Sequence, residues 1–338
     1  MKILITGGAG FLGARLAREL LQRQCLRGQR IQRLVLADLA ELHDPVLSAD
    51  ARVHMRVGDL LAQMPALMAE DFDAVFHLAS AVSAECEADF DLGLRANLDT
   101  TRALLDACRA QSARGGPVPL FVFSSSVAVY GSDPALPLPA EVDDRTLPTP
   151  QSSYGIHKFI CEQLVADYTR KGYIDGRAAR LMTVAVRPGP PNRAASSFLS
   201  SIVREPLAGL PAICPVAPDT EVALASPAST IAGLLTVAEA SREDFAGRTA
   251  LNLPALTVTV QQMLDALRDI GGQDALRCVR FQPDATIARI VGGWPSRFDS
   301  ARARALGLSP DRDVHSIVRQ YVRDHRQAVR NAQALSMP

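Results

Sequence analysis

The sequence lacks the features that direct proteins to membranes, nucleic acid or the extracellular space. Its 36 basic residues are balanced by 36 acidic ones, so no charge excess favours nucleic acid or an anionic membrane surface. No apolar run reaches the roughly 18 residues of a transmembrane helix. A strand-like run begins at residue 3, so we expect no secretory signal peptide. We therefore expect a cytoplasmic protein.

Cysteine is sparse and scattered. No C-x-x-C pair occurs among the six cysteines, which are Cys25, Cys86, Cys108, Cys161, Cys214 and Cys278. This spacing is typical of reduced thiols in the cytoplasm, and it argues against a disulfide framework or a zinc site. The six histidines are not grouped at ligand spacing either, so we expect no metal.

The first thirteen residues, MKILITGGAGFLG, join an apolar strand to a glycine-rich turn and the start of a helix. Gly7 permits a tight turn, Gly10 lets the backbone approach a pyrophosphate, and Gly13 lets the helix pack on the strand. The N–H groups at the start of the helix, around Phe11 and Leu12, would face the phosphates, where the helix dipole favours negative charge. This stretch predicts a dinucleotide-binding site.

The identity of the dinucleotide is indicated by the second strand. Residues 34–37 are apolar and end in Asp38. An acidic residue at this place accepts hydrogen bonds from the adenosine ribose and repels the 2′-phosphate of NADP. This favours NAD as the cofactor, while Arg30, Arg33 and Arg52 lie near enough in the sequence to keep NADP open.

A third strand, over residues 53–57, precedes two residues that suit an adenine ring. Asp59 can accept a hydrogen bond from the adenine amino group, and Leu60 can supply an apolar wall. Capping of the following helix is the alternative role for Asp59.

A fourth strand, over residues 73–78, is followed by small residues that allow a ligand to approach the backbone. We expect Leu78, Ala79 and Ser80 to border the cofactor. His77, inside this strand, is expected to be a packed core histidine rather than a catalytic one.

The alternation of strands and helices predicts an α/β fold. A Rossmann domain with a doubly wound parallel sheet is expected over residues 1–187, and a smaller C-terminal α/β substrate lobe, partly interleaved with it, over 188–338. A fifth strand over 120–123 and a sixth over 182–186 extend the sheet, and the proline-rich residues 134–150 are a candidate lid. Helices are expected over 90–112, 154–171, 196–208, 229–240, 259–270 and 313–335.

Candidate catalytic residues follow the fifth strand. Tyr154 and Lys158 are four residues apart on an expected helix, so their side chains share one face. A phenol with a pKa near ~10 is a poor base at neutral pH, but an adjacent ammonium lowers that pKa. Tyr154 is then a general acid/base for alcohol–carbonyl interconversion, and Ser126 can hydrogen-bond the developing oxyanion. For the Tyr–Lys pair taken alone, a solvated helix face is the alternative.

In combination these features resemble the short-chain dehydrogenase/reductase superfamily, specifically its extended, epimerase-like branch. The resemblance covers residues 1–190 with specific motifs and the remainder with weaker ones. The matching segments are Thr6–Gly13, Asp38, Asp59-Leu60, His77–Ala79, Asn97, Ser124–Ser126 with Val129–Gly131, and Tyr154–Lys158.

The resemblance implies a role for each catalytic residue. Tyr154 would be the acid/base, and Lys158 would bind the nicotinamide ribose and lower the pKa of the tyrosine. Ser126 would position the substrate oxygen, with Ser125 close to it. Asn97 would support the site from its helix, although the glycine that often follows in Asn-x-x-Gly-Thr is absent here.

The resemblance also implies a cofactor pocket and an assembly. Ser124 and Pro188 would line the pocket for NAD. The helices over 90–112 and 154–171 would pair across the interface of a homodimer.

Such proteins also include dehydratases, sugar-nucleotide epimerases and nucleotide-sensing regulators. Dehydratases of the branch carry Thr-Asp-Glu where this chain has Ser126-Val127-Ala128, so the carboxylates needed to eliminate water are missing. Sugar-nucleotide epimerases share the Ser-Tyr-Lys arrangement and remain the alternative, although residues 224–231 are small and apolar and suit a small substrate. A nucleotide-sensing regulator would usually lose the tyrosine or the lysine, and both are present.

Several stretches resemble a group within the branch that oxidises D-erythronate. They are residues 186–192, 195–198, 204–207, 224–227 and 293–295. The implied reaction is NAD-dependent oxidation of the C2 hydroxyl of this small sugar acid to a 2-keto acid. Trp294, within the last stretch, is expected to pack in the core.

A small sugar acid needs its carboxylate held, and a guanidinium does so through two parallel hydrogen bonds. Arg187 and Arg193 are the nearest candidates along the chain. Ser80, Ser83 and Ser197 are candidate contacts to the substrate. For each arginine, a surface or structural ion pair is the alternative.

Overall fold

The computed structural model describes residues 1–189 and 194–336. The chain forms two compact units, and it passes between them several times. The first unit comprises Met1–Val129, Ser152–Arg180 and Ile231–Leu251, and the second comprises Tyr130–Gln151, Leu181–Thr230 and Asn252–Pro338. The expected domain boundary between residues 187 and 188 stays a prediction.

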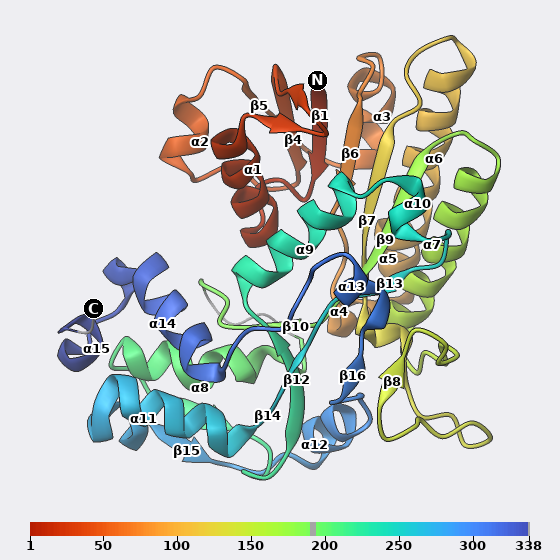
Figure 1. Cartoon of the computed structure of the whole chain (residues 1–338). Coiled ribbons are helices and arrows are strands. Elements are labelled where there is room, and N and C mark those ends of the chain that lie inside the picture. Colours follow the sequence, from red (N-terminus) through yellow and green to blue (C-terminus); the bar gives the residue numbers. More distant parts are fainter. Residues whose placement is uncertain (190–193, 337–338) are drawn as a thin grey trace. The chain divides into compact units, whose positions relative to one another are not determined.

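A seven-stranded sheet lies in the first unit (Figure 1). Strands β1, β4, β5, β6 and β7 pair in parallel, as expected. From β1 the chain adds β4 and β5 on one side and then returns to place β6 on the other, so the direction of winding switches between β1 and β6. The strands in sheet order are β13 (Leu251–Asn252), β9 (Asp175–Leu181), β7 (Leu120–Ser126), β6 (Ala74–His77), β1 (Lys2–Thr6), β4 (Arg33–Asp38) and β5 (Val53–Val57).

Apolar side chains explain why these strands form the centre of the unit. Residues 3–5 and 34–36 are wholly buried, as expected for a parallel sheet covered on both faces. Helix α7 (Ser153–Arg170) packs against β7 and against α6 (Thr100–Ala113), as Figure 1 shows. The other elements of this unit are α1 (Phe11–Arg23), the hairpin β2 (Cys25–Leu26) and β3 (Gln29–Arg30), α2 (Pro45–Ala49), α3 (Leu60–Leu67), α4 (Ser83–Ala88), α5 (Phe90–Gly93), η1 (Leu94–Asp99), η2 (Val127–Val129) and α10 (Arg242–Phe245).

The sixth strand of the sheet differs from the expected one. It is β9 over Asp175–Leu181, whereas residues 183–184 form β10 in a separate sheet. The sequence did not predict this strand because it contains Arg177 and Arg180. Two arginines in seven residues are not typical of a buried strand. Both are buried, since Asp175 pairs with the first and Glu162 with the second.

The helix expected over residues 90–112 contains a wider turn. It is observed as α5, the π-helical segment η1 and α6. The backbone N–H of Thr100 donates to the carbonyl of Arg95, five residues earlier, and the Thr100 hydroxyl donates to the same oxygen at 2.9 Å. Such π turns inside α-helices are frequent at functional sites, and this one carries Asn97.

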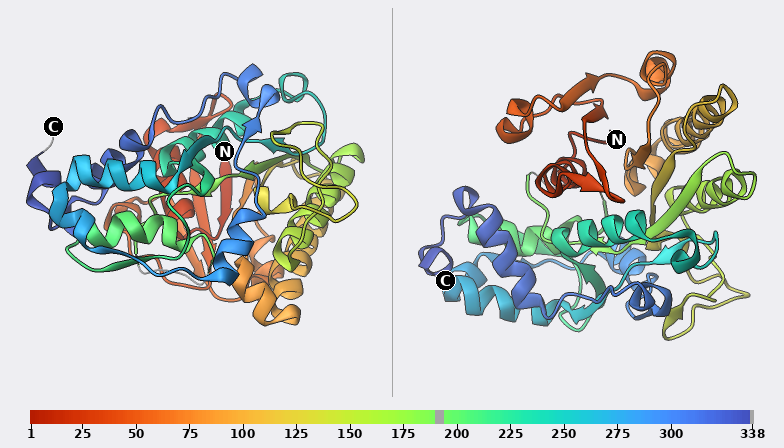
Figure 2. Two further views of the ribbon diagram at one scale, coloured as in Figure 1. Left: turned by 90° about the horizontal axis from the view of Figure 1, so that it is seen from below. Right: turned by 45° about the horizontal axis from the view of Figure 1, so that its top comes forward.

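The second unit is built on small sheets and a helical layer. Strands β10 (Thr183–Val184), β12 (Glu221–Ala225) and β14 (Leu256–Thr259) form one sheet, β11 (Ala212–Cys214) pairs with β15 (Val279–Phe281), and β8 (Val142–Asp143) pairs with β16 (Phe298–Asp299). Helix α11 (Val260–Arg277) lies beside α8 (Ser197–Leu207) and α14 (Val314–Asp324), and all three can be followed in Figure 2. The remaining helices are α12 (Ala285–Gly292), α13 (Ala301–Ala305), η3 (Arg326–Ala328) and α15 (Ala332–Ser336), while α9 (Pro227–Glu239) contributes residues to both units.

Two expected helices of this region have different lengths. The helix expected over 259–270 continues to Arg277, with a break at Gly272, whose φ is +75°. The helix expected over 313–335 is divided into α14, η3 and α15. Trp294 is partly buried against the core of the second unit, which confirms its expected packing role.

The described residues hold no helix that is long and apolar enough to cross a membrane. The same part of the chain contains no group of three or more metal-ligating side chains. All six cysteines are free thiols.

Candidate active site

The glycine turn is packed so closely that side chains would not fit. A Cβ placed on Gly13 would lie 2.1 Å from the carbonyl oxygen of Gly7, and a Cβ on Gly7 would lie 2.8 Å from the amide nitrogen of Ala79. Gly7 also has a φ of +70°, which glycine adopts readily. Gly8, which the sequence interpretation did not single out, meets the β4 strand, since a Cβ there would lie 2.7 Å from the Cβ of Leu36.

This turn has the position that a dinucleotide site needs. Its glycine backbone, without side chains, lies at the edge of the sheet where the direction of winding switches. Gly7 directly follows β1 and contacts Ala79 after β6, and β1 and β6 are the two strands on either side of the switch. Ligands of open α/β sheets bind at such a point, outside the carboxyl ends of the strands. Phe11 and Leu12 begin α1 directly after Gly10, which places the helix N-terminus at this edge.

Asp38 links the end of β4 to the glycine turn. Its carboxylate accepts hydrogen bonds from the backbone N–H groups of Ala9 at 3.0 Å and Gly10 at 3.2 Å, and from Ala40 at 3.1 Å. The carboxylate of Asp38, expected to bind the ribose, is thus held next to the glycine turn, which is expected to bind the phosphates.

Asp59 caps a helix, which was its alternative role. Its side chain accepts a hydrogen bond from the N–H of Ala62 at 2.9 Å, in the first turn of α3, and pairs with Arg95 at 3.2 Å. The Ala62 bond is the largest cause of the lowered pKa of Asp59. Leu60 is the first residue of the same helix. Contact of either residue with adenine stays a prediction.

The loop after β6 is held by Asn97. The amide oxygen of Asn97 accepts bonds from the N–H of Ala81 at 2.8 Å and from the hydroxyl of Ser80 at 3.0 Å. Its amide nitrogen donates to the carbonyl of Ala81 at 3.3 Å. The side chain is buried, so Asn97 holds this loop from the helix, and Ser83 follows as the first residue of α4. A role of Asn97 in the site stays a prediction.

His77 is a core residue, as expected. Its ring nitrogens contact Thr6 Oγ1 at 2.6 Å and Thr101 Oγ1 at 2.9 Å. Thr101 donates to the carbonyl of Asn97, so its oxygen accepts from Nε2–H and the neutral ring accepts from Thr6 at Nδ1. Burial lowers the pKa of His77 to about 3, which keeps the ring neutral.

The three serines at the end of β7 have different partners. The hydroxyl of Ser124 donates to the carbonyl of His77 at 3.0 Å and ties β7 to β6. The hydroxyl of Ser125, expected beside the substrate, is buried and donates to Glu162 at 2.5 Å. Ser126 is half-buried, and its hydroxyl oxygen accepts from the N–H of Ala128 at 3.1 Å, which leaves its proton available for another acceptor.

Lys158 is buried close to Tyr154, the candidate acid/base. Its ammonium donates to the carbonyl of Ser124 at 2.8 Å and lies 5.5 Å from the centre of the Tyr154 ring and 4.9 Å from that of Phe123. Tyr154 is half-buried in the first turn of α7, whose N-cap Ser152 accepts from Gly155. The expected proximity of tyrosine and lysine is therefore present.

Burial of Lys158 changes the pKa of its ammonium group. Burial lowers the pKa of Lys158 to about 8, against the opposing effects of Cys161, Cys86 and Glu162. At neutral pH the charged form still predominates, because this pKa lies above 7. A positive charge is thus present next to the phenol, where it favours the phenolate.

Glu162 and Arg180 are polar residues of this region that the sequence interpretation missed. Glu162 accepts from Ser125 and forms a buried pair with Arg180. One signal was available: Glu162 follows Lys158 by four residues, so it continues the face of Tyr154 and Lys158.

The remaining candidate residues belong to the second unit. The N–H of Arg187 donates to Ser200 at 3.0 Å, and its carbonyl accepts from Arg204 at 2.7 Å. Pro188 is half-buried, and Ser197 is the first residue of α8. Arg193 lies outside the described residues. Their contacts with cofactor or substrate stay predictions.

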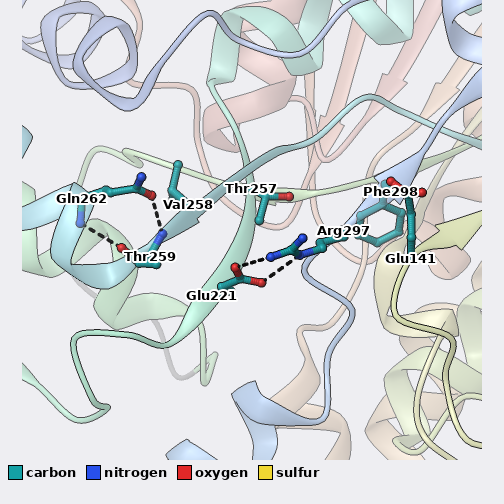
Figure 3. Close-up of a pocket in the computed structure, with 8 residues that line it drawn as sticks. All are labelled: Glu141, Glu221, Thr257, Val258, Thr259, Gln262, Arg297 and Phe298. Atoms are coloured by element: carbon teal, nitrogen blue, oxygen red, sulfur yellow. Dashed lines mark hydrogen bonds and ion pairs between the residues drawn. The ribbon is translucent and has the colours of Figure 1, made fainter.

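The second unit also contains a cavity of about 410 Å³ (Figure 3). None of the candidate site residues lines it. Its charged and polar groups are largely bonded to one another, since Arg297 pairs with Glu221 at 2.7 Å and Thr259 forms a reciprocal cap with Gln262. It is lined by Glu141, Glu221, Thr257, Val258, Thr259, Gln262, Arg297 and Phe298.

Comparison with known proteins identifies relatives over nearly the full chain. The sequence profile described as the NAD dependent epimerase/dehydratase family matches residues 3–220. The chain is 47% identical to the D-erythronate dehydrogenase of Cupriavidus necator, with 96% of this chain and 98% of that protein covered. It is 40% identical to the D-erythronate dehydrogenase of Haemophilus influenzae, with 95% and 99% covered.

A solved structure is similar in both fold and sequence. It is the crystal structure of a nucleoside-diphosphate-sugar epimerase from Agrobacterium tumefaciens, at a TM-score of 0.90 and 38% identity, with 97% of this chain and 95% of that chain covered. The two kinds of name differ in the reaction, while the fold is the same Rossmann-type architecture.

Proposed function

This chain belongs to the NAD-dependent epimerase/dehydratase family and is an NAD-dependent oxidoreductase, and we propose that it oxidises the C2 hydroxyl of D-erythronate to the 2-keto acid. The observation that carries the chemistry is the buried Lys158 ammonium held between the Ser124 carbonyl and the Tyr154 ring. Similarity over nearly the full chain to two D-erythronate dehydrogenases supports the substrate.

In the proposed reaction Tyr154, as the phenolate, takes the proton of the C2 hydroxyl while the carbon–oxygen double bond forms. Bound NAD would supply the acceptor for the hydride that leaves carbon 2. The Lys158 ammonium stabilises the phenolate by its charge, and the Ser126 hydroxyl donates a hydrogen bond to the reacting oxygen. Gly7, Gly10, Gly13 and Asp38 would hold the phosphates and ribose of the cofactor.

The groups that hold the acid are proposed from the sequence. A guanidinium recognises a carboxylate bidentately, and we assign this role to Arg187 or Arg193. Ser80, Ser83 and Ser197 would contact the substrate, and Ser125, which is buried with its hydroxyl donated to Glu162, would lie close to it behind Ser126. We expect the enzyme in the cytoplasm.

A sugar-nucleotide epimerase is the second candidate, because the solved relative from Agrobacterium tumefaciens carries that name. The two functions differ in the fate of the hydride. An epimerase returns it to the substrate in every turnover, whereas a dehydrogenase leaves it on the cofactor.

Stoichiometric NADH is therefore the expected product with D-erythronate. Purified protein would be incubated with NAD and D-erythronate, L-threonate and related four- to six-carbon sugar acids, and NADH absorbance followed. The same panel with NADP is expected to be much slower, since Asp38 disfavours the 2′-phosphate. Interconversion of a UDP- or GDP-sugar without NADH accumulation would replace this proposal by the epimerase.

We also propose a homodimer formed through α5 and α7. Phe90, Leu92, Ile156 and Ile160 are large apolar side chains with 61%, 45%, 44% and 39% of their surface exposed. The Phe90 ring lies 6.4 Å from that of His157, so the two helices adjoin. Contiguous exposed apolar side chains commonly mark protein–protein interfaces.

The double variant Ile156→Glu, Ile160→Glu is expected to be a monomer by light scattering after size-exclusion chromatography. Ile156 follows Tyr154 by two residues and Ile160 follows Lys158 by two residues. Both therefore lie on the opposite face of the helix from Tyr154 and Lys158. Val118→Glu, at an exposed apolar residue outside these helices, serves as the control and should leave the assembly unchanged. A monomeric wild-type protein would contradict the dimer.

A further inference from the structure

A buried polar cluster joins the strand that carries Ser126 to the helix that carries Tyr154 and Lys158. Ser125 of β7, Glu162 of α7 and Arg180 of β9 have 2%, 2% and 7% of their surface exposed. Ser125 Oγ donates to Glu162 Oε1 at 2.5 Å. Arg180 donates to both carboxylate oxygens, from Nε to Oε1 at 2.8 Å and from Nη2 to Oε2 at 2.6 Å. All three residues belong to the first unit.

Stability alone does not account for this cluster. Burying two charges costs free energy that their attraction repays only in part, and apolar side chains of similar volume often stabilise a core as well or better. The cluster also fixes the relative orientation of the residues that it joins. A guanidinium that binds both oxygens of a carboxylate permits one relative orientation, and the Ser125 hydroxyl adds a third bond from another strand.

The position of Glu162 on α7 connects the cluster to the candidate catalytic residues. Glu162 follows Lys158 by one helical turn and Tyr154 by two, so the three share a face. Ser125 stands between Ser124, whose carbonyl accepts from Lys158 at 2.8 Å, and Ser126. Two consecutive residues of β7 are thus each bonded to α7.

We propose, building on the dehydrogenase function above, that Glu162 is a positioning residue. Held by Ser125 and Arg180, it sets where α7 lies along the end of β7, and so where the Tyr154 phenol lies relative to the Ser126 hydroxyl. Proton transfer requires donor and acceptor within hydrogen-bond reach, and a displacement of ~1 Å can cost about 10²-fold in rate. Glu162 acts through the helix that carries the acid/base.

The negative charge of Glu162 has a second effect. It opposes the burial that lowers the pKa of Lys158. Replacing the carboxylate with an amide therefore lowers the fraction of charged lysine at neutral pH. With less positive charge beside it, Tyr154 would lose its proton at higher pH.

Ser125→Ala is the first test, because it removes one hydrogen bond and keeps the buried ion pair. We expect kcat to fall by about tenfold, as loss of a hydrogen bond to a charged group allows, with an unchanged KM for NAD. Ser125→Thr keeps the hydroxyl and is expected to retain most of the wild-type kcat. Glu162→Gln, if it folds, is expected to lower kcat further.

Arg177→Gln is the matched control, since it removes another buried arginine of the same strand from its carboxylate partner, the half-buried Asp175 at 2.6 Å. It is expected to lower the thermal midpoint while leaving kcat unchanged. A wild-type kcat in Ser125→Ala, or an equal loss of kcat in Arg177→Gln, would overturn the positioning role.

A second measurement needs no substrate and separates this proposal from the proposed function. Ultraviolet absorbance of tyrosinate is titrated in the wild type and in Tyr154→Phe, and the difference reports Tyr154. In the Glu162→Gln background this titration is expected at higher pH. If the wild type oxidises no sugar acid, the proposed function fails, and the titration still tests Glu162; an unchanged titration in both Ser125→Ala and Glu162→Gln rejects it.

Discussion

Replacing Tyr154 with phenylalanine is expected to lower kcat by about 10²- to 10⁴-fold, which is the usual contribution of a general acid or base. The phenol is the group placed beside a buried ammonium, with Lys158 Nζ 5.5 Å from the ring centre. Phenylalanine keeps the ring and its packing but cannot take a proton. Single-turnover formation of NADH is the measurement, because it isolates the chemical step.

Tyr168→Phe is the matched control for this prediction. Tyr168 lies on the same helix, and its hydroxyl donates to Asp106 at 2.6 Å, so the change also removes one phenolic hydroxyl from α7. We expect it to leave kcat unchanged. Near-normal turnover in Tyr154→Phe, with the fold and NAD binding intact, would show that another group carries the proton.

Replacing Gly13 with alanine is expected to abolish cofactor binding at ordinary NAD concentrations and to destabilise the first unit. The added Cβ would lie 2.1 Å from the Gly7 carbonyl oxygen and 2.8 Å from the Gly8 Cα, both of which are backbone atoms. Because backbone cannot rotate away as a flexible side chain does, the turn or α1 must shift. Overpacking of this kind costs about 3 kcal/mol at the upper end of its usual range.

The measurement for Gly13→Ala is NAD binding by calorimetry, together with the thermal midpoint. Gly292→Ala is the control, since nothing lies within 4 Å of a Cβ at Gly292, the last residue of α12. That variant should match the wild type in both measurements. Unchanged NAD affinity in Gly13→Ala would show that the turn is not the phosphate site.

Much of the site was visible in the sequence because its parts are local. The glycine turn depends on residues within one strand–helix connection, and the Tyr154–Lys158 pair depends on helical spacing alone. Both are present as expected, and so is the packed His77. Periodicity and covalent geometry act over a few residues, so a pattern in the sequence suffices to predict them.

The strand β9 shows where such patterns fail. Its arginines argue against a buried strand until their partners are known, and the partner of Arg180 lies 18 residues away on another element. A buried charge is acceptable only when a specific counter-charge reaches it, and that depends on the packing of whole elements. For the same reason, the sequence did not predict the hydrogen bond between Ser125 and Glu162.

The sequence by itself determined the family, the cofactor and the first five parallel strands of the large sheet, because these rest on local turns and repeating apolar positions. The tertiary structure alone decided that Asp59 caps a helix, that Asn97 shapes the loop after β6, and that Ser125 bonds to Glu162. Hydrogen-bonding side chains can satisfy several partners equally well in principle. Which one they meet is decided by the folding of distant segments into one packed interior, where each buried polar group must find a partner.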